Sequence, residues 1–136
     1  MKALHLLIKR VNALTIEGYT HFISSFANDT DVLLAQIIGS FRYKNKNLVL
    51  EAVIPIENKL NSLDKIKYAL MLYNKVTVIQ EQRGHECFQK RNKYMIDNSD
   101  VVVALWDEKT SKETYNAVNY ARSQGKEIIR MSPLQE

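Results

Sequence analysis

The sequence predicts an α/β protein, a three-layer Rossmann-like domain with a mainly parallel sheet of about five strands. Short runs rich in apolar and β-branched residues alternate strictly with segments of helical spacing. The strand-like runs barely alternate between polar and apolar residues, which is typical of parallel strands covered by helices on both faces. Strands separated by helices of this length join through right-handed crossovers, and a parallel sheet follows.

The predicted strands have the lengths and residue types of buried strands. They are Thr20 to Ser24, Leu48 to Ile54, Lys75 to Gln80, Asp100 to Trp106 and Lys126 to Met131. The predicted helices have apolar residues at steps of three and four. They are Met1 to Glu17, about Asp29 to Tyr43, Ser62 to Tyr73, His85 to Asn98 and Thr110 to Gln124. Gly18 and Gly125 each follow a helix at a position suited to a C-terminal cap.

Length and composition predict one globular domain, residues 1–136, with a substantial core. The chain has 136 residues, of which 46% are hydrophobic and 25% charged. Its longest apolar stretches, such as Val101 to Trp106, are far shorter than the roughly 20 residues that span a bilayer. The N-terminus lacks a signal-peptide pattern. We therefore expect a soluble, cytoplasmic protein with no membrane partner.

The cysteine and histidine residues predict neither a disulfide nor a metal site, and no cofactor is expected. Cys87 is the single cysteine, so it cannot form an internal disulfide. The three histidines do not have the spacing of zinc ligands. His85, Glu86 and Cys87 are adjacent on a predicted helix, where successive side chains point about 100° apart. They are better interpreted as a helix start with a half-buried thiol.

The net charge of +4 permits an anionic partner without requiring one. The densest basic group is Arg42, Lys44 and Lys46, with Phe41 and Tyr43 interleaved. This combination can contact nucleic acid. A solvated helix end is the favoured interpretation, so nucleic acid is not the expected partner.

Candidate binding residues lie where the predicted strands end, because open parallel sheets bind ligands beyond the carboxyl ends of their strands. These segments are Ser24 to Asp31, Pro55 to Lys59, Gln80 to Glu86 and Asp107 to Glu113. On the helix that follows the third segment, Arg91 and Asn92 lie along an apolar stripe. An arginine there can grip a phosphate or a carboxylate. The alternative is a structural arginine bonded to Asp97, to Asp100 or to a backbone carbonyl.

The turn Ser24 to Asp31 reads SSFANDTD and contains no glycine. Asn28 or Asp29 is suited to cap the following helix, so the turn places carboxylates at a helix N-terminus. Carboxylates complement the helix dipole there but repel a phosphate. We therefore expect any ligand at this turn to be contacted by side chains rather than by bare backbone amides.

Several stretches together resemble one protein family. They are GYTHFIS at Gly18, Ala27 with Asp31, LEAVIPIEN at Leu50, RNKYMIDNSDVVVALWD at Arg91, and TYNAVNYARSQGKEIIRMSP at Thr114. From about Leu4 to Pro133 the chain resembles the YpsA-like branch of the SLOG superfamily, which also includes the DprA and LOG proteins. The most specific part is the pattern RNxxMxDxSDxxxAxxD, which begins at Arg91.

This resemblance implies a Rossmann-like fold and a nucleotide or nucleotide-derived ligand at the strand ends. The implied ligand contacts are Ser24, Ser25, Asp31, Glu57, Asn58, Arg91, Asn92, Asp107, Thr114 and Asn116. The chain departs from the family because the glycines of both ligand-binding turns are replaced. No acid stands at Asn116 or Ala117, where the LOG branch has a catalytic glutamate. We therefore expect a non-catalytic binding domain of bacterial or phage origin.

Two alternatives stay open within the resemblance. One is a LOG-type nucleoside 5'-monophosphate phosphoribohydrolase, in which Arg91 acts and Glu57 substitutes for the missing acid. The other is a DprA-like module that binds single-stranded nucleic acid or protein through the patch from Arg42 to Lys46.

The first strand of the family has no counterpart, since Met1 falls at the start of the following helix. That strand belongs in the interior of the sheet, so its absence predicts a gap or an unpaired edge. A partner chain or a rearranged sheet would close the gap. We expect a homodimer, because pairing two copies would hide the apolar surface that the missing strand leaves.

Overall fold

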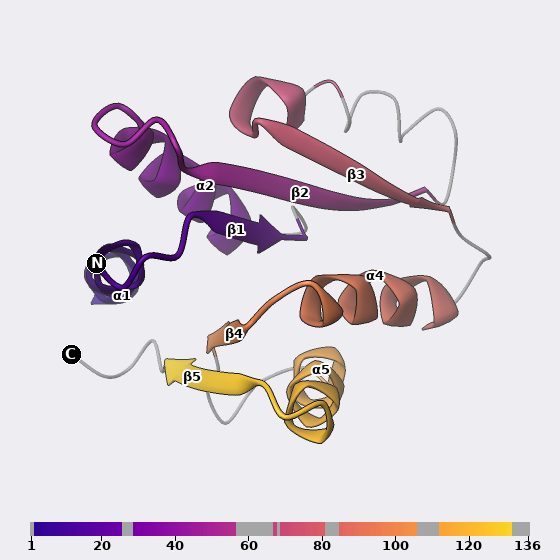
Figure 1. Cartoon of the computed structure of the whole chain (residues 1–136). Coiled ribbons are helices and arrows are strands. Elements are labelled where there is room, and N and C mark those ends of the chain that lie inside the picture. The colour runs from indigo at the N-terminus through magenta and orange to yellow at the C-terminus, as the bar shows by residue number, and fades with distance from the viewer. Residues whose placement is uncertain are drawn as a thin grey trace.

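A computed structural model of the chain describes residues 2–25, 29–56, 67, 69–80, 85–105 and 112–131. Figure 1 shows their arrangement, and a short helical segment at residues 69–72 precedes the third strand. The elements are α1 (Lys2–Ile16), β1 (His21–Ser24), α2 (Asp29–Arg42), β2 (Val49–Ile56), β3 (Lys75–Gln80), α4 (His85–Asp97), β4 (Val101–Leu105), α5 (Lys112–Ser123) and β5 (Glu127–Met131).

The predicted alternation of helices and strands is confirmed. Each predicted strand is present, and its ends differ from the prediction by at most two residues. Of the predicted helix from Ser62 to Tyr73, the described part is helical at residues 67 and 69–72. No helix in the described part of the chain is both long enough and apolar enough to span a membrane.

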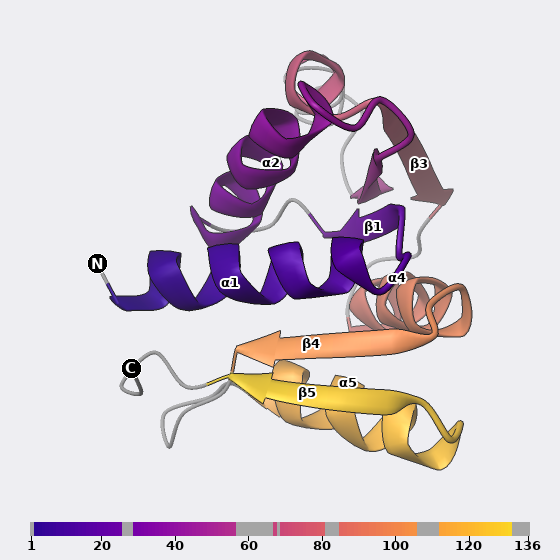
Figure 2. The same ribbon diagram turned by 60° about the vertical axis from the view of Figure 1, so that its left-hand side comes forward.

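The strands form two parallel sheets rather than the single sheet of about five strands that the sequence predicted. One sheet has the order β1-β2-β3 and the other consists of β4 and β5. In both views β4 lies between the larger sheet and β5, so β1 and β4 are the edges that face each other (Figures 1 and 2). The division lies between β1 and β4, which do not hydrogen-bond to each other.

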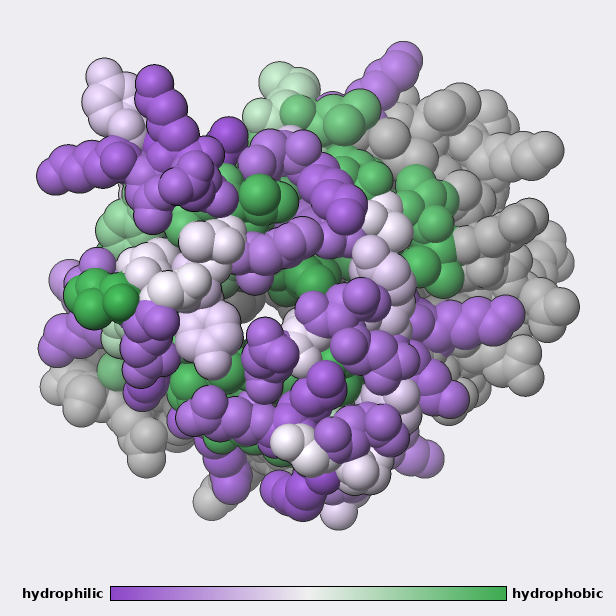
Figure 3. All heavy atoms as spheres, in the orientation of Figure 1, coloured by the Kyte–Doolittle hydropathy of each residue, from purple (hydrophilic) through white to green (hydrophobic). Residues whose placement is uncertain are grey.

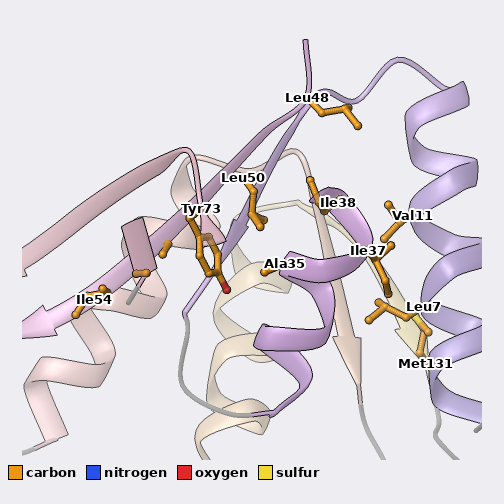
Figure 4. Close-up of a cluster of buried hydrophobic side chains, with 12 residues drawn as sticks. Leu7, Val11, Ala35, Ile37, Ile38, Leu48, Leu50, Ile54, Tyr73 and Met131 are labelled. Atoms are coloured by element: carbon orange, nitrogen blue, oxygen red, sulfur yellow. The ribbon is translucent and has the colours of Figure 1, made fainter. Parts of the chain in front are cut away.

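Helices cover both faces of the larger sheet. Successive residues of a strand point to opposite faces, and on β2 the side chains of Leu50, Ala52 and Ile54 join a core cluster with residues of α1 and α2. Figure 4 shows this cluster in the space between the two helices and the sheet. The intervening Glu51 points to the other face, where it contacts α4. All three core residues are at most 1% exposed, as expected for a central strand covered on both sides.

Two glycines end helices as the sequence predicted. Gly18 after α1 has a φ of 104°, and Gly125 after α5 has a φ of 71°. The amide of Tyr19 donates to the carbonyl of Leu14 at 3.0 Å, and the amide of Lys126 donates to the carbonyl of Ala121 at 3.1 Å. Each of these two bonds is the long hydrogen bond of a Schellman cap. The cap needs one residue in the left-handed conformation, which only glycine adopts at little cost.

We predict opposite effects of alanine at two glycines. Gly125→Ala should lower the free energy of unfolding by about 1–2 kcal/mol, because a Cβ is strained at a left-handed residue. Gly39→Ala should raise it by about 0.5–1 kcal/mol, because Gly39 is exposed inside α2 and nothing lies within 4 Å of the added carbon. Urea denaturation of both variants measures the two shifts. Equal effects of the two substitutions would contradict the assignment of Gly125 as a cap.

Candidate functional site

A cleft separates the two sheets and is the principal candidate site. It has a volume of about 460 Å³ and lies between the facing edges β1 and β4. Leu7, Val11 and Leu14 of α1 line one wall, and Met95 of α4 contributes to the lining as well. Figure 3 shows the surface hollowed near the centre of the view, where Figure 1 places β1 above β4. The volume lies within the range of about 300–1,000 Å³ that is usual for small-molecule sites.

Polar side chains lie at both ends of this cleft. Ser24 and Asp31 line it where β1 ends and α2 begins. His21, at the start of β1, and Asp100, just before β4, line it at the opposite end. The cleft therefore has an apolar middle between two polar ends, and the carboxyl end contains two of the predicted ligand contacts.

Tyr73 orders the carboxyl end of the cleft. Its hydroxyl donates to the backbone carbonyl of Asp31 at 3.1 Å. Since this uses the only phenolic proton, the hydroxyl of the buried Ser24 donates to the Tyr73 oxygen at 2.9 Å. The hydroxyl of Ser25 donates to the Asp31 carboxylate at 3.1 Å. These bonds fix three predicted contact residues, Ser24, Ser25 and Asp31, relative to one another.

The surroundings of Tyr73 keep its hydroxyl protonated. Burial raises the pKa of Tyr73 to about 12, the hydrogen bond from Ser24 opposes this, and the nearby charge of Asp31 adds to it. The phenol is thus a donor at any physiological pH. Tyr73 acts as a positioning residue for the start of α2 and has no need to ionise.

A second polar group surrounds the carboxylate of Glu51, whose side chain is 1% exposed. It accepts hydrogen bonds from the Thr77 hydroxyl at 2.5 Å and from the Tyr94 hydroxyl at 2.8 Å. His21 lies 2.7 Å away through Nε2, which carries a proton because a carboxylate only accepts. The ammonium group of Lys75 is 3.7 Å from the same carboxylate. Glu51 therefore connects β2 to β1, β3 and α4.

These contacts keep Glu51 ionised. Burial by itself raises the pKa of Glu51, but the hydrogen bonds from Thr77, Tyr94 and His21 and the charge of Lys75 outweigh it. The net effect is a pKa below the ordinary value of 4.5. A buried carboxylate with this set of donors is a structural ion whose removal leaves several donors unsatisfied.

The other predicted contacts that the structure describes lie apart from Ser24 and Asp31. Arg91 is 5% exposed and lies one turn before Tyr94 on α4, so it faces the sheet. Asn92 and Asn116 line a smaller groove of about 250 Å³ between α4 and α5. Thr114 lies in the first turn of α5 and is half-buried. The structure thus brings the predicted residues together in two separate groups, with Arg91 buried between helix and sheet.

The remaining predicted contacts, Glu57, Asn58 and Asp107, lie outside the described residues, as do the side chains of His85, Glu86 and Cys87. The strand register nevertheless shows that the carboxyl ends are staggered. Ser24, the last residue of β1, is opposite Ala52, and β2 continues to Ile56. At about 3.3 Å per residue, β2 ends roughly 13 Å beyond β1. Among the described residues no group of three histidine, cysteine or acidic side chains is placed to hold a metal ion.

Sequence reasoning missed the central residue of each polar group, Tyr73 and Glu51, together with the four residues that contact Glu51. Glu51 carried a local signal, because it is a charged residue inside a run predicted to be buried on both faces. Tyr73 had no such signal, since its partners Asp31 and Ser24 are 42 and 49 residues away. Only the fold brings them together.

We predict that Glu51 contributes stability that depends on pH. Because its folded pKa is lowered, the contribution is fully present above the unfolded value of 4.5 and is lost as the pH falls through the folded value. At pH 7, Glu51→Gln should lower the free energy of unfolding by about 2 kcal/mol. Urea denaturation between pH 7 and pH 3 measures both the loss and its pH dependence.

Glu127→Gln is the matched control, since Glu127 is an exposed carboxylate on β5. It should leave stability within about 0.5 kcal/mol of the wild type at every pH. The difference in the free energy of unfolding between the wild type and Glu51→Gln should shrink as the pH falls below 4.5. If this difference stayed constant, the role assigned to the Glu51 carboxylate would be wrong.

Comparison of the chain with models of known protein families gives no match, and neither does comparison with curated protein sequences. The candidate site is therefore interpreted from its own geometry.

Proposed function

We propose that the protein is a non-catalytic domain that binds a nucleotide or nucleotide-derived molecule at the carboxyl end of the cleft. The observation that carries the proposal is the placement of Ser24 and Asp31 on the wall of a cleft of about 460 Å³. Tyr73 and Ser25 hold both residues in place, so the contacts are formed before a ligand arrives. Preorganised polar groups at the edge of an apolar cleft are typical of small-molecule sites.

The chemistry of these side chains favours the sugar of a nucleoside over its phosphate. A carboxylate accepts hydrogen bonds from ribose hydroxyls, as acidic residues do in dinucleotide-binding folds. The apolar wall formed by Leu7, Val11 and Leu34 suits the face of a base. A phosphate would be repelled by Asp31 and is better placed toward Arg10, which also lines the cleft.

The proposal extends to the architecture. We assign the two parallel sheets to one Rossmann-like, SLOG-like domain whose ligand-binding turns have lost their glycines. The motif residue Arg91 is buried on the sheet-facing side of α4, which suits a structural role better than direct ligand contact. The expected homodimer stays a prediction, and the molar mass in solution tests it.

We predict that Asp31→Asn weakens nucleoside binding by about tenfold or more, because an amide replaces the ionised acceptor of the ribose hydroxyls. Isothermal titration with adenosine, AMP, ADP-ribose and a cyclic nucleotide measures the affinities. Asp100→Asn is the control, since Asp100 lines the same cleft at its opposite end. Binding of none of these probes to the wild type, or equal losses in the two variants, would refute the proposal.

A second candidate function rests on Tyr43, whose side chain is 89% exposed directly after α2. It lies between Arg42 and Lys44, and exposed aromatic residues among basic ones can stack on the bases of single-stranded nucleic acid. If the protein has this function, Tyr43→Ala should weaken oligonucleotide binding by about 1–3 kcal/mol, and the affinity should fall as the salt concentration rises. Fluorescence anisotropy with a labelled oligonucleotide decides it, and undetectable binding at low salt would exclude it.

A further inference from the structure

The cleft between the sheets is bordered by two open strand edges. Within the described part of the chain, β1 pairs with β2 alone and β4 pairs with β5 alone. Both edges line the cleft, through His21 to Ser24 on one side and through Val101 and Val103 on the other. An open edge exposes a row of backbone donors and acceptors that can pair with another strand.

The hydrogen bonds of β1 identify the groups that face the cleft. The carbonyl of Thr20 accepts from the amide of Val49 at 2.7 Å, so Thr20 points toward β2. The amide and carbonyl of successive residues point to alternate sides of a strand, so Phe22 and Ser24 also pair with β2. The amides and carbonyls of His21 and Ile23 therefore point into the cleft.

The two edges also have compatible directions. Helix α4 runs back along the larger sheet from the carboxyl end of β3 and leads to the amino end of β4 (Figure 1). Figure 2 shows β1 and β4 running toward the same side of the molecule. A strand placed between them can thus pair in parallel with both, as every observed pair in this protein does.

The walls of the cleft determine the composition of such a strand. Residues of α1, among them Leu7 and Val11, cover one face, and Met95 of α4 lies on the other side of the sheet. A parallel strand covered on both faces is apolar on both faces. The cleft lining contains two carboxylates, Asp31 and Asp100, and one guanidinium, that of Arg10, while the imidazole of His21 is bonded to Glu51. This charge balance favours basic residues on either side of the apolar core.

We propose that the cleft receives an extended strand from a partner polypeptide, with an apolar, β-branched core and basic flanks, which pairs in parallel with β1 and β4. Strand addition joins the two sheets into one continuous sheet and satisfies both backbone edges at once. A small molecule at the carboxyl end would leave the edge groups of His21 and Ile23 unpaired. The inference therefore goes beyond the proposed ligand and does not depend on it.

Hydrogen exchange and peptide binding test the proposal. The probe is a short synthetic peptide of alternating valine and isoleucine flanked by lysines, and the control peptide has a proline at its centre. The probe should slow amide exchange about tenfold or more at Ile23 and at those amides of Val101–Leu105 that do not pair with β5, and the control peptide should not. The outer edge strand β3 is an internal reference, because unselective pairing would protect Lys75–Gln80 as well.

Two valines of nearly equal exposure provide matched variants. Val103 lines the cleft from β4 and is 37% exposed, whereas Val78 on β3 is 38% exposed and lies outside the cleft lining. Val103→Lys should weaken peptide binding by about tenfold or more, and Val78→Lys should leave it unchanged. Equal binding by both variants, or protection of β3 instead of β1 and β4, would overturn the proposal. So would strong protection of Ile23 in the free protein, and protection that grows with protein concentration would assign the cleft to a second copy of this chain.

Discussion

The buried carboxylate of Glu51 fixes the arrangement on which the rest of the molecule depends. It lies on the central strand of the larger sheet and is bonded to His21 of β1, Thr77 of β3 and Tyr94 of α4. A charge in such a place is tolerated only while its donors stay in position. Any sliding of β1 or α4 along β2 would break at least one of these bonds. His21 lines the cleft and is also bonded to Glu51, so Glu51 fixes the position of the β1 edge of the cleft.

The elements of the fold could be predicted because their causes are local. Runs such as Val101 to Leu105 are continuously apolar, which is typical of parallel strands in α/β proteins, and this leaves a pattern in the sequence. The caps at Gly18 and Gly125 were predictable for a similar reason, since a left-handed residue needs glycine. The division into two sheets had no such signal in composition or spacing. Which strand edges meet is decided by contacts between residues far apart in the chain, and those contacts leave no periodicity.

The part of the candidate site that lies within one turn was predictable from the sequence, and its grouping with other strand ends was not. Ser24, Ser25 and Asp31 belong to one turn, so the sequence places them together, and the structure joins Ser25 and Asp31 by a hydrogen bond. Grouping them with the ends of other strands assumed that parallel strands end at one level. The register shows otherwise, since Ser24 is opposite Ala52 and β2 continues to Ile56. The length of a strand beyond its neighbour is a property of the pairing, and composition does not encode it.

The turn after β1 contains no glycine, and this limits what kind of recognition the cleft can offer. A glycine-rich turn binds phosphate through bare backbone amides, because no side chain prevents close approach. Here Ser24, whose hydroxyl is bonded to Tyr73, and Asp31 line the cleft instead, and the carboxylate of Asp31 is suited to hydroxyl or amide donors. The backbone groups that face the cleft are instead those of the strand edge, where the amides of His21 and Ile23 point into the cleft. The two proposals therefore use different parts of the cleft for recognition: side chains at the carboxyl end for a small molecule, and the backbone between the sheets for another strand.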